Sequence, residues 1–359
     1  MSGLTAPVVA PAARPSLGWL AKVAEVLAPF VIALTAGALI LAATGRDAIG
    51  TYVLLAEQAY GGQDQIANTL VAATPILFTG LATAVAFKAG IFNVGVEGSL
   101  YLGAFAAAWV GFSFVDLPGP LLVVGGALTA MLAGLVWAAI PGLLRAFWQV
   151  DEVVTTLMFN YVAILFTGYL VNFQFLAPGV ANSMSPLIAS SAQLPPIVPS
   201  SQLTLAFVVA ILATLLYAYL FRGTTTGYRL RIVGLNPRFA SAVGLDIKRT
   251  IMVAMVISGA LGGLAGAFQI LGVNYRFIDN FSPGYGFTGI AVALLGRGNA
   301  LGIFLAALFF GGLSSGGSMI QLFSNIPLDL VNVLQGTVMI FAVVELWRVG
   351  ALAGRLRRG

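Results

Sequence analysis

The chain has 359 residues, of which 59% are hydrophobic and only 8% are charged, and its mean hydropathy is +0.99. Soluble domains carry about 25% charged residues, so this composition excludes a soluble enzyme and predicts a protein that crosses a membrane several times. The sequence has no cysteine and no histidine, which excludes disulfides, thiolate metal sites, cysteine nucleophiles and histidine bases.

Ten apolar stretches are candidates for membrane helices, because a helix needs about 20 apolar residues to cross a bilayer. The eighth is too short to cross as a regular helix, and we expect a half-helix or a re-entrant piece there. We therefore expect an all-α, polytopic helical bundle of about ten segments, or of eight or nine if the short piece does not cross. The stretches are residues 26–43, 66–87, 92–112, 121–143, 153–175, 203–221, 251–271, 286–295, 301–323 and 328–347.

The flanking sequences predict the domain organisation. Residues 1–25 are expected to form a disordered cytoplasmic tail and residues 348–359 a basic cytoplasmic tail. Residues 26–347 are expected to form a single membrane domain with a cytoplasmic loop at 222–250. Most basic residues lie at alternate ends of the apolar stretches, and the positive-inside rule then places both termini in the cytoplasm.

The first polar stretch, residues 90–99, places an amide, a carboxylate and three glycines between two apolar stretches. Asn93 and Glu97 share one face if the stretch is helical, but the glycines are equally typical of an interrupted helix. An ionisable group at membrane depth is a functional candidate by default, so we expect Asn93 and Glu97 to line a solute pathway. The alternative is a structural carboxylate that pairs with Lys88 or binds the amides of a broken helix.

A second polar stretch, residues 274–286, precedes the short eighth segment. Its amides, aromatic rings and carboxylate are groups that hold a planar polar solute by stacking and hydrogen bonding. This adds Asn274, Tyr275 and Asp279 to the predicted pathway, and the alternative is an outer loop with an interfacial aromatic belt. Asn160, inside the fifth apolar stretch, is expected either to face solute or to bond a neighbouring helix.

The long connection over residues 176–202 is expected to lie outside the membrane. Its five prolines exclude a helix in lipid. A solvated loop and a docking surface for an external partner are equal alternatives for it.

Glycines recur at four-residue spacing in two later stretches. Small residues at this spacing let helices approach closely, so we expect tight helix packing and assign no further role. The pairs are Gly259/Gly263, Gly262/Gly266 and Gly312/Gly316.

The cytoplasmic loop contains start and stop signals for a short helix. Asn236 is a good N-cap, Pro237 suits the first helical position and Gly244 suits the residue after the end. We expect a two-turn helix over residues 237–243 that is offered to a soluble partner, and the alternative is a basic loop on anionic headgroups. The predicted contact residues are Asn236, Pro237, Arg238, Phe239, Ala240, Val243 and Gly244.

The chain shows no nucleotide-binding loop of its own. A Walker A loop needs a lysine directly after a glycine, but Lys22, Lys88 and Lys248 all follow other residues. The sequence therefore predicts a transport subunit rather than an enzyme, with no metal site, and any ATP that drives it is expected to bind another subunit.

Several blocks, in this order, resemble the permeases of nucleoside-type ABC importers, within the wider group of ribose-type and branched-chain amino-acid permeases. The resemblance implies a type II importer fold and an alternating-access mechanism in the bacterial inner membrane. Nucleosides are the first expectation for the solute, and a simple sugar in the same class is the alternative; a self-sufficient carrier or channel is the rival from another class. The blocks are residues 80–98, 152–161, 234–244, 257–268 and 289–296.

The resemblance also implies partners. They are a second related permease chain, two cytoplasmic ATPase chains and a periplasmic or lipid-anchored solute-binding protein. By the same resemblance, residues 237–244 look like the coupling helix that docks on the ATPase. No cofactor is expected in this chain, because ATP and magnesium would be used by the ATPase subunits.

Overall fold

The structure, a computed structural model, describes residues 47–324 without a gap, together with scattered positions between 31 and 45 and between 332 and 340. This part of the chain is helical apart from its connections, and its two β-bridges are isolated pairs, which confirms the expected all-α architecture. The helices are α2 (Ala48–Tyr60), α3 (Gln63–Lys88), α4 (Val96–Ser113), α5 (Gly119–Trp148), α6 (Glu152–Tyr169), α7 (Leu205–Gly223), α8 (Thr225–Leu235), α9 (Pro237–Ala242), α10 (Ile247–Gln269), α11 (Tyr285–Leu295) and α12 (Ala300–Ser324). Two π-helical segments, η1 (Leu170–Gln174) and η3 (Ile270–Asn274), extend α6 and α10, and η2 (Ser190–Ala192) is a short 3-10 turn.

Among the described residues, six helices are long and apolar enough to cross a membrane, namely α3, α5, α6, α7, α10 and α12. The short segment α11 is present as the sequence predicts. Helix α4 is not among the six, and it begins at Val96 rather than at residue 92, because the residues before it form a loop. The stretches 26–43 and 328–347 and both predicted tails lie largely outside the described residues, so the total number of crossings stays a prediction.

Two helices occupy regions for which the sequence analysis predicts only connections. Helix α2 is capped by Asp47, whose side chain accepts a hydrogen bond from Ile49 N (3.0 Å). Helix α8 is capped by Thr224, whose hydroxyl accepts from Gly227 N (3.1 Å). Asp and Thr are both favoured N-caps, so a local signal for each helix start was present in the sequence.

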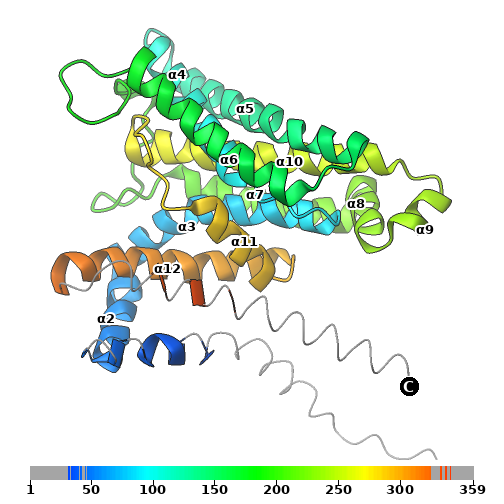
Figure 1. The fold of residues 1–359 in the computed structure, drawn as a ribbon. Helices are drawn as coiled ribbons and strands as arrows, with labels where there is room; N and C mark the ends of the chain where they lie inside the picture. Colours follow the sequence, from blue (N-terminus) through cyan, green and yellow to red (C-terminus); the bar gives the residue numbers. More distant parts are fainter. Residues whose placement is uncertain are drawn as a thin grey trace, which may run out of the picture.

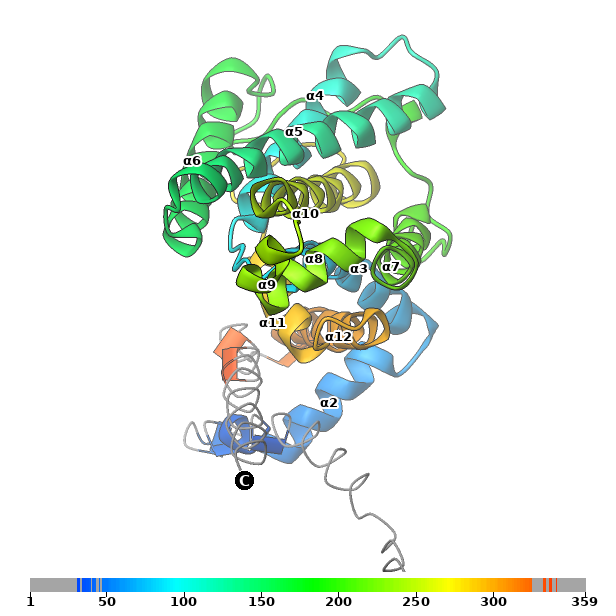
Figure 2. The same cartoon turned by 90° about the vertical axis from the view of Figure 1, so that its right-hand side faces the viewer.

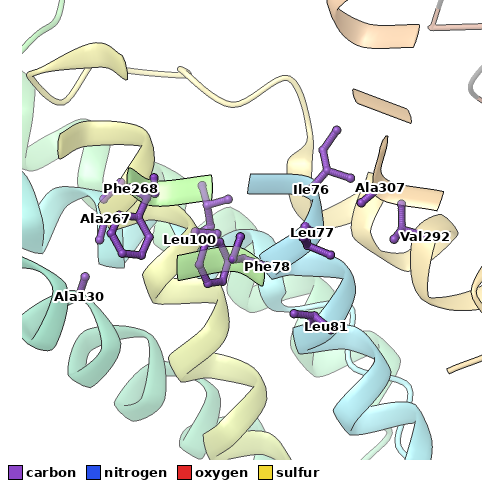
Figure 3. Packing of buried hydrophobic residues seen from close by; sticks show 14 of the residues in the cluster. Ile76, Leu77, Phe78, Leu81, Leu100, Ala130, Ala267, Phe268, Val292 and Ala307 are labelled. Atoms are coloured by element: carbon purple, nitrogen blue, oxygen red, sulfur yellow. The ribbon is translucent and has the colours of Figure 1, made fainter. Parts of the chain in front are cut away.

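Helix α3 lies at the centre of the bundle (Figures 1 and 2). Figure 2 shows α4, α5, α6 and α10 on one side of it and α11, α12 and α2 on the other. Leu77, Phe78 and Leu81 of α3 contribute to a continuous core with residues of α10, α4, α11 and α12 (Figure 3). The ring of Phe78 stacks on Phe268 of α10 with centroids 5.5 Å apart. In a membrane, helices associate mainly through close van der Waals packing, and α3 is the helix that packs against both halves of the bundle.

The outer helices expose apolar side chains instead. On α5, residues Leu128, Leu132 and Val136 follow one another at helical spacing, and each is more than half exposed. In water such a stripe is unfavourable, whereas lipid chains cover it without cost. This face of α5 is therefore suited to contact with lipid or with another membrane helix.

The glycines of α10 permit very close packing, as their spacing predicts. Gly263 lies against the backbone of Ala130 in α5, and a Cβ there would come within 2.8 Å of the Ala130 carbonyl carbon. Gly259 and Gly134 face each other across the same interface, and Gly103 of α4 lies against Gly263 from the other side. Three helices thus meet backbone to backbone at mid-length, where no side chain fits.

Two loop regions lie at opposite ends of the bundle. Helices α8 and α9 project at one end, and the long connection between η1 and α7 lies at the other (Figure 1). That connection is not a freely solvated loop, because Ser185, Ile188 and Leu194 within it are buried. Its residues 183–188, which we name the strap, hydrogen-bond to residues 275–279, so the two polar regions after η1 and η3 form one packed unit.

Candidate functional site

The first break, residues 90–95, is an irregular backbone segment between α3 and α4. It begins at Gly90, whose φ of +75° favours glycine and which packs on Gly234 of α8. It ends where the Asn93 side chain accepts a hydrogen bond from Gly95 N (2.8 Å) and donates one to Ser258 Oγ of α10 (2.9 Å). The interrupted form of the polar stretch is thus the one observed, and Asn93 and Glu97 do not lie on one helix.

Helix α6 supplies the polar groups that this backbone needs. Asn160 accepts from Gly98 N (2.8 Å) and donates to Val94 O (2.9 Å). The hydroxyl of Thr156 accepts from Val94 N (3.1 Å). An irregular backbone away from water must have its N–H and C=O groups satisfied by neighbouring protein, and α6 does this here. Asn160 therefore bonds a neighbouring segment, the second of its two predicted roles.

The first break reaches the interior of the bundle. Ser258, the partner of Asn93, lies eleven residues into α10, which at 1.5 Å per residue places it about 16 Å from the start of that helix. The first break is therefore held well inside the length of α10 and not at its end.

The second break, residues 275–284, connects η3 to the short helix α11. Its outer part pairs with the strap: Ser185 N donates to Phe277 O (2.8 Å) and Ile188 N donates to Tyr275 O (2.9 Å). Its inner part is capped by Ser282, whose hydroxyl accepts from Gly284 N and Tyr285 N at 3.1 Å each. Both breaks therefore lead into the N-terminus of a helix.

The two breaks converge on Glu97. Its Oε2 atom accepts a hydrogen bond from Gly286 N in the first turn of α11, and its side chain also hydrogen-bonds to Ser282. Glu97 is only 2% exposed. In the part of the chain that the structure describes, the one ion pair joins Arg145 to Glu152, so Glu97 is bound by helix-end groups and not by Lys88.

The other predicted pathway residues lie on the outer side of this junction. Asn274 accepts from Gln269 Nε2 at 3.5 Å. Tyr275 contributes to a surface cavity of about 410 Å³ that it shares with residues 196–202. Asp279 N donates to Ser183 O (2.9 Å). Among the described residues, no hydrogen bond connects these three to Asn93, Glu97 or Asn160. We therefore name Asn274, Tyr275 and Asp279 the outer group, and Asn93, Glu97 and Asn160 the inner group.

Tyr101 belongs to the inner group, although it is not among the predicted pathway residues. It lies one turn after Glu97 on α4, its ring contacts Phe281 with centroids 4.9 Å apart, and its hydroxyl accepts from Ser282 N (3.4 Å). The spacing of four residues from Glu97 is the signal that identifies it, because such residues share a helix face. Thr156 and Ser258 give no comparable signal, since their partners are distant in the chain.

We expect Asn160→Ala to destabilise the protein by about 3 kcal/mol, because it leaves a buried N–H and a buried C=O without partners. Thermal unfolding of the purified protein in detergent measures this. Met158→Ala on the exposed face of the same helix is the control and should change the stability by less than about 1 kcal/mol. Equal effects of the two substitutions would show that the amide does not hold the first break.

The predicted cytoplasmic helix is present as α9. The Asn236 side chain accepts from Phe239 N (3.0 Å), Pro237 is the first helical residue and Gly244 has a φ of +80°. Ala240 is fully buried, whereas Phe239 is 52% exposed. The helix is thus anchored on one face and presents an apolar side chain on the other.

Exposed apolar residues extend beyond Phe239 on this projection. Val243 is 54% exposed and Leu235, at the end of α8, is 82% exposed. The three lie four residues apart. Large apolar side chains left exposed on a projecting element suit contact with another molecule.

The sequence matches known transport proteins over most of its length. Residues 65–343 match the family described as the branched-chain amino acid transport system/permease component. The guanosine ABC transporter permease protein NupP of Bacillus subtilis is 36% identical over 338 residues, which cover 92% of this chain and 96% of that protein. The nucleoside ABC transporter permease protein NupB of Lactococcus lactis is 33% identical over 336 residues, covering 90% and 92%.

A third relative is named for a different solute. The glucose ABC transporter permease protein TsgB13 of Haloferax volcanii is 34% identical over 338 residues, which cover 91% of this chain and 88% of that protein. No solved structure matches the chain significantly. The match of one family over residues 65–343, together with the helical membrane bundle, places the chain in the branched-chain amino acid transport system/permease component family, as a multi-pass permease subunit of an ABC transporter.

Proposed function

We propose that this permease imports nucleosides across the bacterial inner membrane. The observation that carries the proposal is the similarity to two relatives named for guanosine and nucleoside transport, which extends over at least nine-tenths of each protein. The family match over residues 65–343 includes both breaks, so the similarity is not confined to one helix.

A simple sugar is the second candidate solute. The relative named for glucose transport is 34% identical, a value between the 36% and 33% of the other two. A nucleoside contains a ribose as well as a base, so a passage for nucleosides and one for sugars share the need for hydroxyl-binding groups. The base is the part that distinguishes them, and aromatic rings stack on it.

We place the energy source of transport in partner subunits. The chain has no glycine-lysine pair for a Walker A loop, and α9 offers an anchored helix with exposed Phe239 and Val243. In this proposal α9 docks on a cytoplasmic ATPase chain, which uses ATP and magnesium, and both termini of the permease are cytoplasmic. A second permease chain and an external solute-binding protein complete the assembly.

The proposed mechanism is alternating access between two permease chains. In this mechanism some predicted pathway residues would contact solute and others would support the wall of the passage. Tyr275 reaches a surface cavity, which suits direct contact with solute near the outer mouth. Asn93 and Asn160 are 1% exposed and hydrogen-bonded within the chain, which suits support of the passage wall.

Affinity purification from the native membrane tests this proposal. We expect ATPase and solute-binding subunits to co-purify, and the binding subunit to retain guanosine in preference to glucose. Retention of glucose with no affinity for nucleosides would favour the sugar candidate. Purification of the permease with no ATPase chain at any detergent strength that preserves its fold would contradict the assignment of the energy source.

A further inference from the structure

We propose that Glu97 is a positioning residue that fastens the half-helix α11 to the core by joining the N-termini of α4 and α11. This inference rests on the proposed transport function and deepens it, because it gives the buried carboxylate a task other than contact with solute. The junction consists of Glu97, Ser282 and Gly286, and we name it the latch.

The latch is a direct contact between two helix starts. Glu97 is the second residue of α4, and Gly286 is the second residue of α11. The Glu97 carboxylate accepts from Gly286 N. A Cβ on Gly286 would lie 2.7 Å from the Glu97 Cα atom, so the two helices touch with no side chain between them.

A negative charge suits this position for an electrostatic reason. Each helix N-terminus carries about half a positive elementary charge, and two such ends placed together repel each other. An ionised carboxylate between them compensates for both ends, and this is the form that the proposal assigns to Glu97. A neutral amide of the same shape can accept the same hydrogen bond but cannot compensate for the charge.

The latch also holds the residues that precede α11. The Ser282 hydroxyl accepts from Gly284 N and Tyr285 N, which leaves its proton for the hydrogen bond to Glu97. One turn further along α4, the Tyr101 hydroxyl accepts from Ser282 N. Through Glu97, helix α4 thus holds both the first turn of α11 and the inner part of the second break.

Helix α3 also holds the start of α11. The Thr79 hydroxyl donates to Tyr285 O (2.8 Å), and Gly289 allows α11 to lie directly on Thr79. The strap holds the outer part of the second break through the backbone. Among the residues that the structure describes, Glu97 is the one buried acidic or basic side chain, and it attaches the second break and α11 to α4.

The experiment measures the exposure of Phe281, whose ring lies on Tyr101. The chain has no cysteine, so Phe281→Cys introduces a single reporter thiol. We expect Glu97→Ala to raise the maleimide labelling rate of this thiol about fivefold, and Glu97→Gln, which keeps the acceptor, to raise it about twofold. Asp151→Asn, at the N-cap of α6, is the matched control and should leave the labelling rate unchanged.

Uptake kinetics separate positioning from solute contact. In the assembled transporter we expect Glu97→Gln to lower the maximal uptake rate about tenfold with an unchanged half-saturating solute concentration. An unchanged labelling rate in Glu97→Ala, or a shifted half-saturating concentration in Glu97→Gln, would overturn the proposal. Labelling needs no solute, so it tests the latch even if the wild-type complex proves to transport no nucleoside, a result that would overturn only the proposed function.

Discussion

Phe239→Asp is expected to lower ATP-driven uptake by at least about 50-fold while the permease remains folded, because it places a charge at the centre of an apolar contact surface. Phe239 is 52% exposed, so the folding of the permease does not depend on burial of this ring. The neighbouring Ala240 anchors α9 and is left intact. Uptake of solute by the assembled transporter in proteoliposomes measures the effect.

Two variants control for this result. Phe239→Leu keeps an apolar side chain and should retain most of the uptake. Ser241→Asp places the same charge on α9 away from the Phe239 face and should have a much smaller effect. Normal uptake by an intact complex that carries Phe239→Asp would show that α9 does not transmit the motion of the ATPase chains.

Gly263→Ala is expected to destabilise the protein by about 3 kcal/mol or more, which is the second large effect. The new methyl group would lie against the backbone of Ala130, where the nearest carbonyl carbon is 2.8 Å away. Backbone cannot rotate aside as a side chain does, so α10 has to separate from α5. Thermal unfolding in detergent or nanodiscs measures the change.

Gly125 provides a matched control on the neighbouring helix. The nearest atom to a Cβ at Gly125 is Val110 Cγ1 at 3.9 Å, which is ordinary contact. Alanine is favoured over glycine inside a helix by roughly 0.5–1 kcal/mol, so Gly125→Ala is expected to be neutral or stabilising. Equal destabilisation by the two substitutions would contradict the close backbone packing of α5 and α10.

Local signals in the sequence were sufficient for some elements. The cap residues around α9 predict that helix nearly to the residue, because an N-cap, a first-turn proline and a C-terminal glycine act through their own backbone. The glycine spacing of α10 likewise predicts close packing. Helices α2 and α8 were missed, although Asp47 and Thr224 cap them, because neither follows the long apolar pattern used to find membrane helices.

The candidate site depended on contacts between distant residues, which one sequence does not specify. The sequence places Asn93 and Asn160 within apolar surroundings whether they contact solute or support the backbone. Their hydrogen-bond partners distinguish these two roles, and those partners lie more than 60 positions away. The contact between Glu97 and Gly286 spans 189 residues and has no sequence pattern. The long connection was expected to be either a solvated loop or a docking surface, and the pairing of the strap with residues 275–279 is again a contact between distant residues.

The most direct test of the account is uptake of labelled guanosine into proteoliposomes that contain either the complete assembly or this chain alone. We expect uptake by the complete assembly to require ATP and the solute-binding protein, and the chain alone to show none under a proton or sodium gradient. Gradient-driven uptake by the chain alone would contradict the account and identify a self-sufficient carrier.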